Sequence, residues 1–171
     1  MSRPAYRIVP FRPEYLDRIV EITLEGFQGV SIDYWIEETF GFIEPGWRER
    51  KASDVRRAAR TEPEGIFVAL DGTEVIGYVT VETSREKSVG RIADLAVDAR
   101  YRRQGIGTLL LERALRYIKE SGVRLAKIET LANNEAGQAA YPKLGFVEVA
   151  RQIHYVMPVE RIRLGDDAGT P

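Results

Sequence analysis

The sequence predicts a domain of the α/β class, more narrowly α+β, in which helices flank one mixed, mostly antiparallel sheet of about six or seven strands. Three observations carry this prediction. Two alternating apolar runs meet at an Asp-Gly pair, one later helix has a continuous apolar stripe, and three consecutive strands precede a strand–helix–strand unit. That order makes a mixed sheet and excludes a doubly wound parallel one.

The first part of the chain is expected to hold one short strand and then helices. The strand is expected within residues 5–11. From Pro13 onward apolar residues recur at helical spacing. A second helix is expected over residues 31–40, with Ser31 as its N-cap. A third, polar helix follows over residues 48–63.

The second part is expected to alternate between strands and helices. The hairpin at 65–83 turns at Asp71-Gly72. The later elements are a strand at 89–98, a helix at 105–120, a strand at 123–131, a short helix or two turns at 134–146, and a long last strand at 146–159. We expect a single domain over residues 1–160 and a disordered tail at 161–171.

Composition argues against several classes of function. The 171 residues carry a net charge of −1, so no basic field favours nucleic acid as a partner. The absence of cysteine excludes a thiol nucleophile and thiolate metal sites, and the single histidine, His154, cannot form a histidine cluster, so no metal is expected. No apolar run approaches the roughly 18 residues of a membrane span. The first residues lack the apolar core of a signal peptide, so a cytoplasmic location is expected.

The stretch YRRQGIGT, just before and into the strongest helix, has the features of an anion site. The first turn of a helix offers free N–H groups and the positive end of the helix dipole. Gly105 and Gly107 let an anion approach the backbone, and Arg102 and Arg103 add charge. The alternative is a tight loop with solvated arginines. The dinucleotide fingerprint is excluded because Leu110 replaces its third glycine, and the P-loop because Gly-Lys-Ser/Thr is absent.

Two stretches match a known pair of motifs. LAVDARYRRQGIGTLLLERAL has Arg102, Gly105 and Gly107 at the spacing Arg/Gln-x-x-Gly-x-Gly/Ala. NEAGQAAYPKLGF has Asn134 and Tyr141 at the spacing Asn-x-x-Ala-x-x-x-Tyr-x-x-x-Gly-Phe, with a glycine in place of the alanine. With the two motifs in this order and at this separation, the chain resembles the GCN5-related N-acetyltransferase (GNAT) superfamily.

This resemblance covers about residues 91–146 and implies a sheet that splays where acetyl-CoA, the expected co-substrate, binds. It implies that the end of one strand holds the pantetheine arm through backbone groups, and that the amides of the following loop hold the pyrophosphate. The cofactor-binding residues that it implies are Leu95, Ala96, Val97, Arg102, Arg103, Gln104, Gly105, Ile106, Gly107, Thr108, Asn134 and Tyr141.

Direct acetyl transfer in a ternary complex needs a neutral amine as nucleophile and a proton for the departing thiolate. By position in the second motif, the resemblance implies that Tyr141 lies near the thioester sulfur and is the acid. The alternative is a core aromatic on a short amphipathic helix. Pro142 follows directly and removes a backbone donor, so a kink is expected there.

The base is expected to be Glu129, five residues before Asn134. Family members that acetylate protein N-termini are similar at this spacing. The alternative is an exposed strand carboxylate facing Lys127 two residues away. Asp94, in an apolar setting where a carboxylate needs a hydrogen-bonding partner, and Glu82 are rival candidates. A base that acts through water is a further alternative.

The early helices are expected to line the acceptor pocket. An acidic, aromatic rim there would attract a cationic amine. The alternative is an amphipathic helix with buried aromatics and solvated acids. The residues concerned are Asp33, Tyr34, Trp35, Glu37, Glu38, Phe40, Phe42, Glu44 and Trp47.

The sequence therefore predicts an N-acetyltransferase acting on a primary amine of a small molecule or peptide, with neither a nucleic acid nor a membrane as partner. Two alternatives stay open: a non-catalytic acyl-CoA-binding or sensing module of the same fold, and a nucleotide-binding protein that uses the glycine loop alone. The acceptor and the acyl group are not specified. A homodimer paired through sheet edges is also left open.

Overall fold

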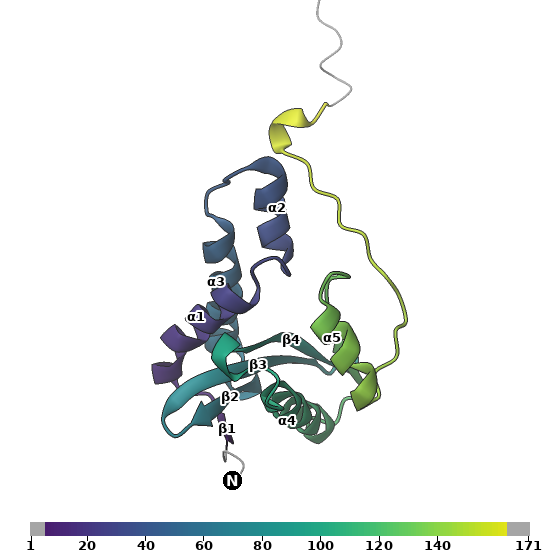
Figure 1. Cartoon of the computed structure of the whole chain (residues 1–171). Helices are drawn as coiled ribbons and strands as arrows, with labels where there is room; N and C mark the ends of the chain where they lie inside the picture. The colour runs from purple at the N-terminus through teal and green to yellow at the C-terminus, as the bar shows by residue number, and fades with distance from the viewer. Residues whose placement is uncertain (1–5, 164–171) are drawn as a thin grey trace, which may run out of the picture.

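A computed structural model of the chain describes residues 6–163, which form a five-stranded sheet with helices on both faces (Figure 1). The strands lie in chain order, and only β4 and β5 are parallel, so the predicted mixed, mostly antiparallel sheet is confirmed. The strands are β1 Arg7–Pro10, β2 Ile66–Asp71, β3 Glu74–Ser84, β4 Val89–Val97 and β5 Leu125–Ile128. The α-helices are α1 Leu16–Gly26, α2 Ile32–Phe40, α3 Trp47–Thr61, α4 Ile106–Glu120 and α5 Glu135–Ala140. The 3-10 helices are η1 Pro13–Tyr15, η2 Pro63–Gly65, η3 Ala99–Tyr101, η4 Pro142–Leu144 and η5 Val159–Arg161.

Local signals place these elements where the sequence predicts them. The Ser31 hydroxyl accepts a 3.2 Å hydrogen bond from the Tyr34 N–H and caps α2 as expected. Between β2 and β3 the chain turns at Gly72, whose φ of 58° is the left-handed conformation that glycine adopts most easily. Both elements therefore begin or end at the residues that the sequence indicates.

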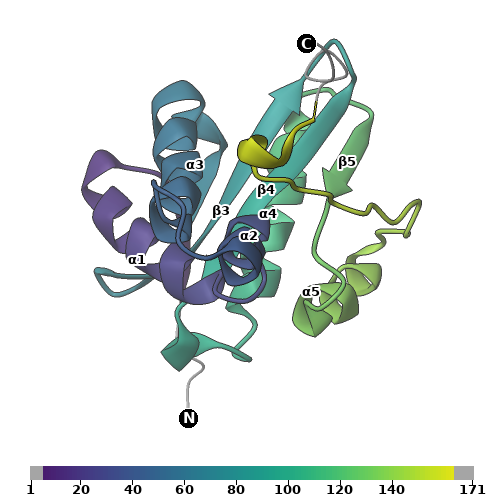
Figure 2. The same cartoon turned by 90° about the horizontal axis from the view of Figure 1, so that it is seen from above.

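The helices cover the two faces of the sheet separately (Figures 1 and 2). On one face α4 buries Leu110 against Ile76 of β3. On the other face Ile22 of α1 and Val55 of α3 pack against Tyr78 of β3. Complete burial of an aliphatic side chain stabilises a fold by about 1.5–3 kcal/mol, so these two layers hold the sheet between them.

Strand β4 contains a bulge that decides where the sheet opens. Opposite Thr80 of β3 lies Asp94, but the next paired residues are Val81 and Ile92, so Ala93 is an extra residue on β4. The side chains therefore change face at this point. Ile92 lies in the core under α4, whereas Asp94 faces α3.

Beyond the bulge, β4 has a free outer edge. Its pairing with β5 runs only from Val89–Leu125 to Ile92–Ile128, while its pairing with β3 continues to Val97. This is the predicted splay of the sheet. Its cause is the extra residue, which bends β4 away from its parallel neighbour.

The long last strand expected at 146–159 was a wrong prediction. After η4 this stretch is extended but pairs with no strand, and it bows away from the sheet to reach η5 beside α2 (Figure 1). Alternation of apolar and polar residues specifies the two faces of a strand but not the sheet edge with which it pairs. Within residues 6–163, the stretch 146–159 pairs with neither edge of the sheet. The described sheet therefore has five strands rather than six or seven. We call residues 147–157 the arm.

The predicted tail at 161–171 falls mainly outside the described residues. Arg161 is the last residue of η5, and Arg163 is the last described residue. In the described part of the chain, no helix has the length and apolar character needed to cross a membrane.

Candidate active site

The segment that joins β4 to α4 begins at a buried carboxylate. Asp98 accepts a 2.9 Å hydrogen bond from the Arg100 N–H and forms ion pairs with the side chains of Arg100, at 2.8 Å, and Arg18 of α1. The hydrogen bond from the Arg100 side chain is the largest influence on its pKa, which is lowered to about 2 although burial acts in the opposite direction. The start of the loop is therefore anchored to α1.

The loop then enters α4 through a left-handed glycine. Gly105 is the N-cap with φ 85°, and Arg103 before it has φ 60°, unusual for a residue with a side chain. The first turn of α4 contains the N–H groups of Ile106, Gly107 and Thr108. These three groups have no helical carbonyl to donate to, because the first such bond is made by the next residue. A Cβ placed at Gly105 or Gly107 meets no atom within 4 Å, so the backbone is open to a ligand on this side.

Two side chains of this loop are engaged within the protein. Nε of Arg102 donates a 3.2 Å hydrogen bond to the Val97 carbonyl at the end of β4. The Gln104 side chain accepts a hydrogen bond from the Tyr6 hydroxyl and donates one of 3.3 Å to the Arg100 carbonyl. These contacts shape the loop, and they leave the main-chain amides of residues 103–108 and the exposed Arg103 side chain available to an anion.

The free edge of β4 leads directly into this loop. Leu95, Ala96 and Val97 lie opposite β3 on one side and have no strand on the other. An unpaired strand edge offers N–H and C=O groups to an extended ligand that carries amides. The open edge of β4 and the open first turn of α4 are thus joined by the loop and η3, although the Val97 carbonyl at the end of β4 is already bonded to Arg102.

Asn134, the first residue of the second predicted motif, is the N-cap of α5. Its Oδ1 accepts a 3.2 Å hydrogen bond from the Gly137 N–H, and its Nδ2 donates a 2.8 Å hydrogen bond to Thr130 Oγ1. Its neighbour Asn133, which the sequence reasoning missed, donates a 2.7 Å hydrogen bond to the Gly29 carbonyl. That contact joins the loop before α5 to the loop between α1 and α2. No local signal could have revealed it, since the two residues are 104 positions apart.

Tyr141 is half-buried at the C-terminal end of α5, where Pro142 starts η4 and produces the expected change of helical geometry. Its ring meets Phe146 edge-on with centroids 6.2 Å apart. A Cβ placed at Gly137 would lie 3.0 Å from the Tyr141 hydroxyl, so the glycine in place of the motif's alanine leaves room for this ring. Burial raises the pKa of Tyr141, and the nearby Thr130 acts in the opposite direction. The phenol is therefore protonated at neutral pH.

Glu129 lies one residue beyond β5 and is paired with two cations. Arg91 Nε donates a 2.8 Å hydrogen bond to its Oε1, and Lys127 Nζ lies 2.9 Å from its Oε2. The hydrogen bond from Lys127, followed by the contacts of Arg91, lowers the pKa of Glu129. Arg91 also donates a 3.1 Å hydrogen bond to Glu82 on β3. The sequence analysis did not single out Arg91. Because Arg91 on β4 bonds both Glu82 on β3 and Glu129 after β5, the two candidate bases lie in one row of charged side chains across the sheet.

The third candidate base, Asp94, is in a structural position. It is 6% exposed and forms an ion pair with Lys51 of α3, and its N–H donates a 2.9 Å hydrogen bond to Thr80 Oγ1. The Lys51 ammonium also lies 4.2 Å from the centroid of the Phe27 ring. The Lys51 ion pair is the hydrogen-bonding partner that a carboxylate in this apolar setting needs.

Two cavities lie near these elements. A polar cavity of about 130 Å³ is bordered by Lys51, Glu82, Arg91 and Asp94, and so lies beside the charged row. A larger one of about 510 Å³ lies at the β1–β2 edge and is lined by none of the candidate residues. Glu82 and Asp94, the two rival candidates for the base, border the smaller cavity, whereas Glu129 does not.

The aromatic residues of the expected acceptor region divide into buried and exposed groups. Trp47 is buried, and the Tyr34 ring meets it edge-on at 5.5 Å. Trp35 and Phe42 are 46% and 71% exposed. The Trp35 Nε1 donates a 2.9 Å hydrogen bond to the Gly29 carbonyl, the same oxygen that Asn133 contacts. The exposed indole is thus fixed beside the loop before α5.

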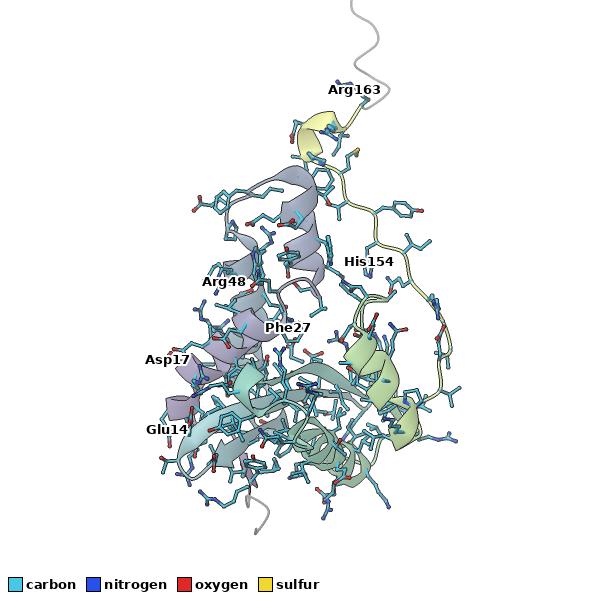
Figure 3. All side chains as sticks on the ribbon, viewed as in Figure 1. Glu14, Asp17, Phe27, Arg48, His154 and Arg163 are labelled. Carbon is cyan, nitrogen blue, oxygen red and sulfur yellow. The ribbon has the colours of Figure 1, made fainter. Side chains whose placement is uncertain are left out.

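The acids of this region are similarly divided. Arg50 lies 3.0 Å from Asp33 and 3.9 Å from Glu37, and Glu37 accepts a 2.7 Å hydrogen bond from the Trp47 N–H at the start of α3. Glu38 and Glu44 are exposed. The exposed Trp35 and Phe42 agree with an aromatic rim, whereas the buried Trp47 agrees with the amphipathic-helix alternative. His154 is exposed on the arm, well away from the sheet (Figure 3).

Comparisons with known proteins agree with this geometry. The model of the Acetyltransferase (GNAT) family matches residues 27–146. The chain is 35% identical over 106 residues to N-alpha-acetyltransferase 30 of Xenopus laevis, which covers 60% of this chain but only 39% of that protein. This chain thus spans well under two thirds of the length of that relative.

Solved structures share the fold. The ribosomal-protein-S18-alanine N-acetyltransferase of Escherichia coli superposes with a TM-score of 0.62 at 22% identity, covering 91% of this chain and 86% of that one. The PaiA N-acetyltransferase of Thermoplasma acidophilum, solved in complex with coenzyme A, has a TM-score of 0.62 at 20% identity, covering 84% and 90%. Within residues 6–163 no group of three or more His, Asp or Glu side chains is placed to hold a metal ion.

Proposed function

Because the chain belongs to the GNAT acetyltransferase family, we propose that it transfers an acetyl group from acetyl-CoA directly to the primary amine of an acceptor bound at the same time. The observation that carries this proposal is the free edge of β4, which continues into the glycine-led first turn of α4.

In this proposal the donor is held mainly by main-chain groups. Residues 95–97 bind the pantetheine arm like an added strand, and the amides of residues 103–108 bind the pyrophosphate. Asn134 contacts the region between the two. When bound, acetyl-CoA supplies the acetyl group as an activated thioester.

The proton transfers use two side chains. Tyr141, which burial keeps protonated, gives its hydroxyl proton to the departing sulfur. Glu129 takes a proton from the acceptor nitrogen, directly or through a water molecule. Because its two cationic neighbours lower its pKa, Glu129 is ionised across the neutral range, and the water-mediated route suits so weak a base better.

The acceptor class that we favour is the α-amine of a protein or peptide. The Xenopus relative is named for this chemistry. The position of Glu129 five residues before Asn134 also resembles that of a glutamate in family members that acetylate protein N-termini. The exposed Trp35 and Phe42, with Glu38 and Glu44, supply aromatic faces and negative charge for a cationic chain end.

A panel of acceptors tests this proposal by release of free CoA thiol. Short peptides with a free N-terminus should support release, whereas the same peptides with a blocked N-terminus and one lysine should not. Polyamines and an aminoglycoside serve as the small-amine arm. Release only with the small amines would reject the peptide acceptor but keep the transferase.

A second candidate function is a non-catalytic acyl-CoA-binding module. It is favoured by one observation, the double ion pair that neutralises Glu129. This module would bind acetyl-CoA in isothermal titration but release no thiol with any acceptor. A chain that binds neither CoA nor acetyl-CoA would reject both functions.

A further inference from the structure

One primary amine of the chain lies directly against the proposed base. Lys127 belongs to β5, and its Nζ lies 2.9 Å from Oε2 of Glu129, two residues further on. Both side chains are open to solvent, with 58% and 46% of their surfaces exposed. A general base must come within hydrogen-bond distance of the nitrogen whose proton it takes. The Lys127 amine meets this condition without an added acceptor.

The other lysines of the chain lack this arrangement. Lys51 is buried, and Asp94 holds its ammonium. The remaining three are exposed, and none of them forms an ion pair with a carboxylate of the described residues: Lys87, Lys119 and Lys143. Within residues 6–163, an exposed lysine paired with a carboxylate therefore occurs only at position 127.

Lys127 also lies close to the point where the sheet opens. It is opposite Arg91 in the parallel pairing of β5 with β4, and Arg91 bonds Glu129, so these charged side chains share one face of the sheet. The next pair, Ile92 and Ile128, is the last one before the strands separate. A lysine amine stands on a flexible four-carbon stem, so it can reach the gap in which the thioester of acetyl-CoA is proposed to lie.

We propose that the chain acetylates its own Lys127 from bound acetyl-CoA. The modification rests on the proposed function, because it uses the same donor, acid and base. After the ammonium has lost one proton to water, the neutral nitrogen attacks the thioester carbonyl carbon, so that a C–N bond forms and the C–S bond breaks. Glu129 takes a second proton from the nitrogen, and the sulfur leaves as the CoA thiol with the hydroxyl proton of Tyr141. Exchange with water then restores both side chains.

Acetylation of Lys127 changes the surroundings of the base. The charged groups next to Glu129 are Lys127 on β5 and Arg91 on β4, and Arg91 is shared with Glu82 on β3. Of the contacts that lower the pKa of Glu129, the hydrogen bond from Lys127 is the largest. An acetylated lysine carries no charge and makes no ion pair. The pKa of Glu129 therefore rises, and a carboxylate with a higher pKa is a stronger base. The modified chain should turn over faster at neutral pH.

Peptide mapping by mass spectrometry, after incubation with acetyl-CoA and no acceptor, tests the modification. Lys127 should gain an acetyl group about a hundredfold faster than Lys119, an exposed lysine in the last turn of α4 that reports the uncatalysed reaction. The rate per chain should not depend on protein concentration. Tyr141→Phe and Glu129→Gln should each slow the reaction at Lys127 toward the rate at Lys119.

Three results of this mapping would overturn the proposal. The first is equal rates at Lys127 and Lys119 in the wild type. The second is a fast rate at Lys127 that survives both Tyr141→Phe and Glu129→Gln, because the reaction would then not use the site. The third is a rate that rises in proportion to protein concentration, because one chain would then modify another.

Preincubation with acetyl-CoA tests the effect on the base. The acid limb of kcat for a peptide acceptor should lie at higher pH in the preincubated wild type than in the fresh enzyme. Lys127→Gln, which has no charge, should show the higher limb without preincubation. Lys127→Arg, which keeps the charge but has no primary amine, should not respond to preincubation. An acid limb that stays in place although Lys127 is acetylated, or a response of Lys127→Arg, would contradict this effect.

The modification and the proposed function fail in different ways. A chain that transfers acetyl groups to an added amine but leaves Lys127 at the rate of Lys119 would overturn self-acetylation alone. A chain that binds acetyl-CoA but acetylates neither an added amine nor Lys127 would reject the transferase and the modification together.

Discussion

Arg91 on β4 holds Glu129 through a 2.8 Å hydrogen bond and at the same time bonds Glu82 on β3 at 3.1 Å. One guanidinium thus joins the carboxylate that the sequence favours as the base, Glu129, to its rival Glu82. Their positions differ, because Glu82 belongs to β3 whereas Glu129 follows β5, where β4 and β5 separate. This difference makes the two acids a matched pair for mutagenesis.

Glu129→Gln should lower kcat by about a hundredfold, the smaller effect expected for loss of general-base catalysis. The Kd for acetyl-CoA should stay unchanged. Glu82→Gln, which removes the other carboxylate bonded to Arg91, should keep most of its activity. Steady-state kinetics with a peptide acceptor measure both. An equal loss in the two variants would mean that the charged row, and not Glu129, is what turnover requires.

The pH dependence of Glu129 follows from its neighbours. Lys127 and Arg91 lower its pKa, so the wild-type rate should fall with acid only below the ordinary titration range of a glutamate. Arg91→Met removes one of these cations and should move that acid limb of kcat to higher pH. An acid limb that does not move would exclude Glu129 as the titrating group.

Tyr141→Phe should reduce kcat by about a hundredfold or more and leave acetyl-CoA affinity nearly unchanged, because it removes only the proton donor. Tyr117→Phe on α4 is the matched control, since burial raises the pKa of that phenol too but Tyr117 lies against Phe67, outside the site. Single-turnover rates and titration of acetyl-CoA separate the two effects. Full turnover without the Tyr141 hydroxyl would disprove its role as the acid.

The two glycines at the start of α4 should respond differently to alanine. Gly107→Ala adds a methyl group toward the open side of the first turn, so acetyl-CoA should bind about tenfold more weakly, while helix propensity gains up to about 1 kcal/mol. Gly105→Ala should weaken binding and also destabilise the fold by about 1 kcal/mol, because its φ is 85°.

Gly122→Ala is the control for this strain. Its φ of 78° lies just beyond the other end of α4, and a Cβ there also meets nothing within 4 Å. It should lose about as much stability as Gly105→Ala with no change in acetyl-CoA affinity. Titration calorimetry and thermal unfolding measure the two quantities. If Gly105→Ala and Gly107→Ala both bound acetyl-CoA as tightly as the wild type, the pyrophosphate would not bind at the first turn of α4.

Asp98→Asn should destabilise the protein at neutral pH by about 1–2 kcal/mol, because the folded pKa of about 2 lies below the ordinary value of 3.8. A lowered folded pKa contributes stability above the unfolded pKa. That contribution is lost as pH falls from about 4 toward 2. The difference between wild type and variant in urea unfolding should therefore shrink over this range. Asp17→Asn, an exposed acid on α1, should change stability by less than about 0.5 kcal/mol.

Local motifs made half of the site predictable. Gly105, Gly107, Asn134 and Tyr141 lie within two short motifs, and the structure has Gly105 and Asn134 as N-caps, Gly107 in the first turn of α4 and Tyr141 as the C-cap of α5. Ser31 is a similar case, since a cap is a contact between residues three positions apart. Signals of this kind are contained in a few consecutive residues and do not depend on the rest of the fold.

What the sequence could not supply is contact at long range. The bulge at Ala93 reverses the faces of β4 in a run that reads as regular alternation. The bond from Asn133 to Gly29 and the bridge from Arg91 to Glu129 join separate elements of the chain. The prediction of a last strand at 146–159 was wrong for a related reason. A strand needs a sheet edge to pair with as well as an alternating apolar pattern.

The free edge of β4 has an evolutionary consequence under the proposed function. Every residue except proline carries the same N–H and C=O groups, so the donor half of the site tolerates substitution along residues 93–97 without losing its contacts. The acceptor half depends on particular side chains, among them Trp35 and Phe42. Descendants of such a chain can acquire new acceptors by changing α2 and the loop after it, while they keep the same acetyl donor.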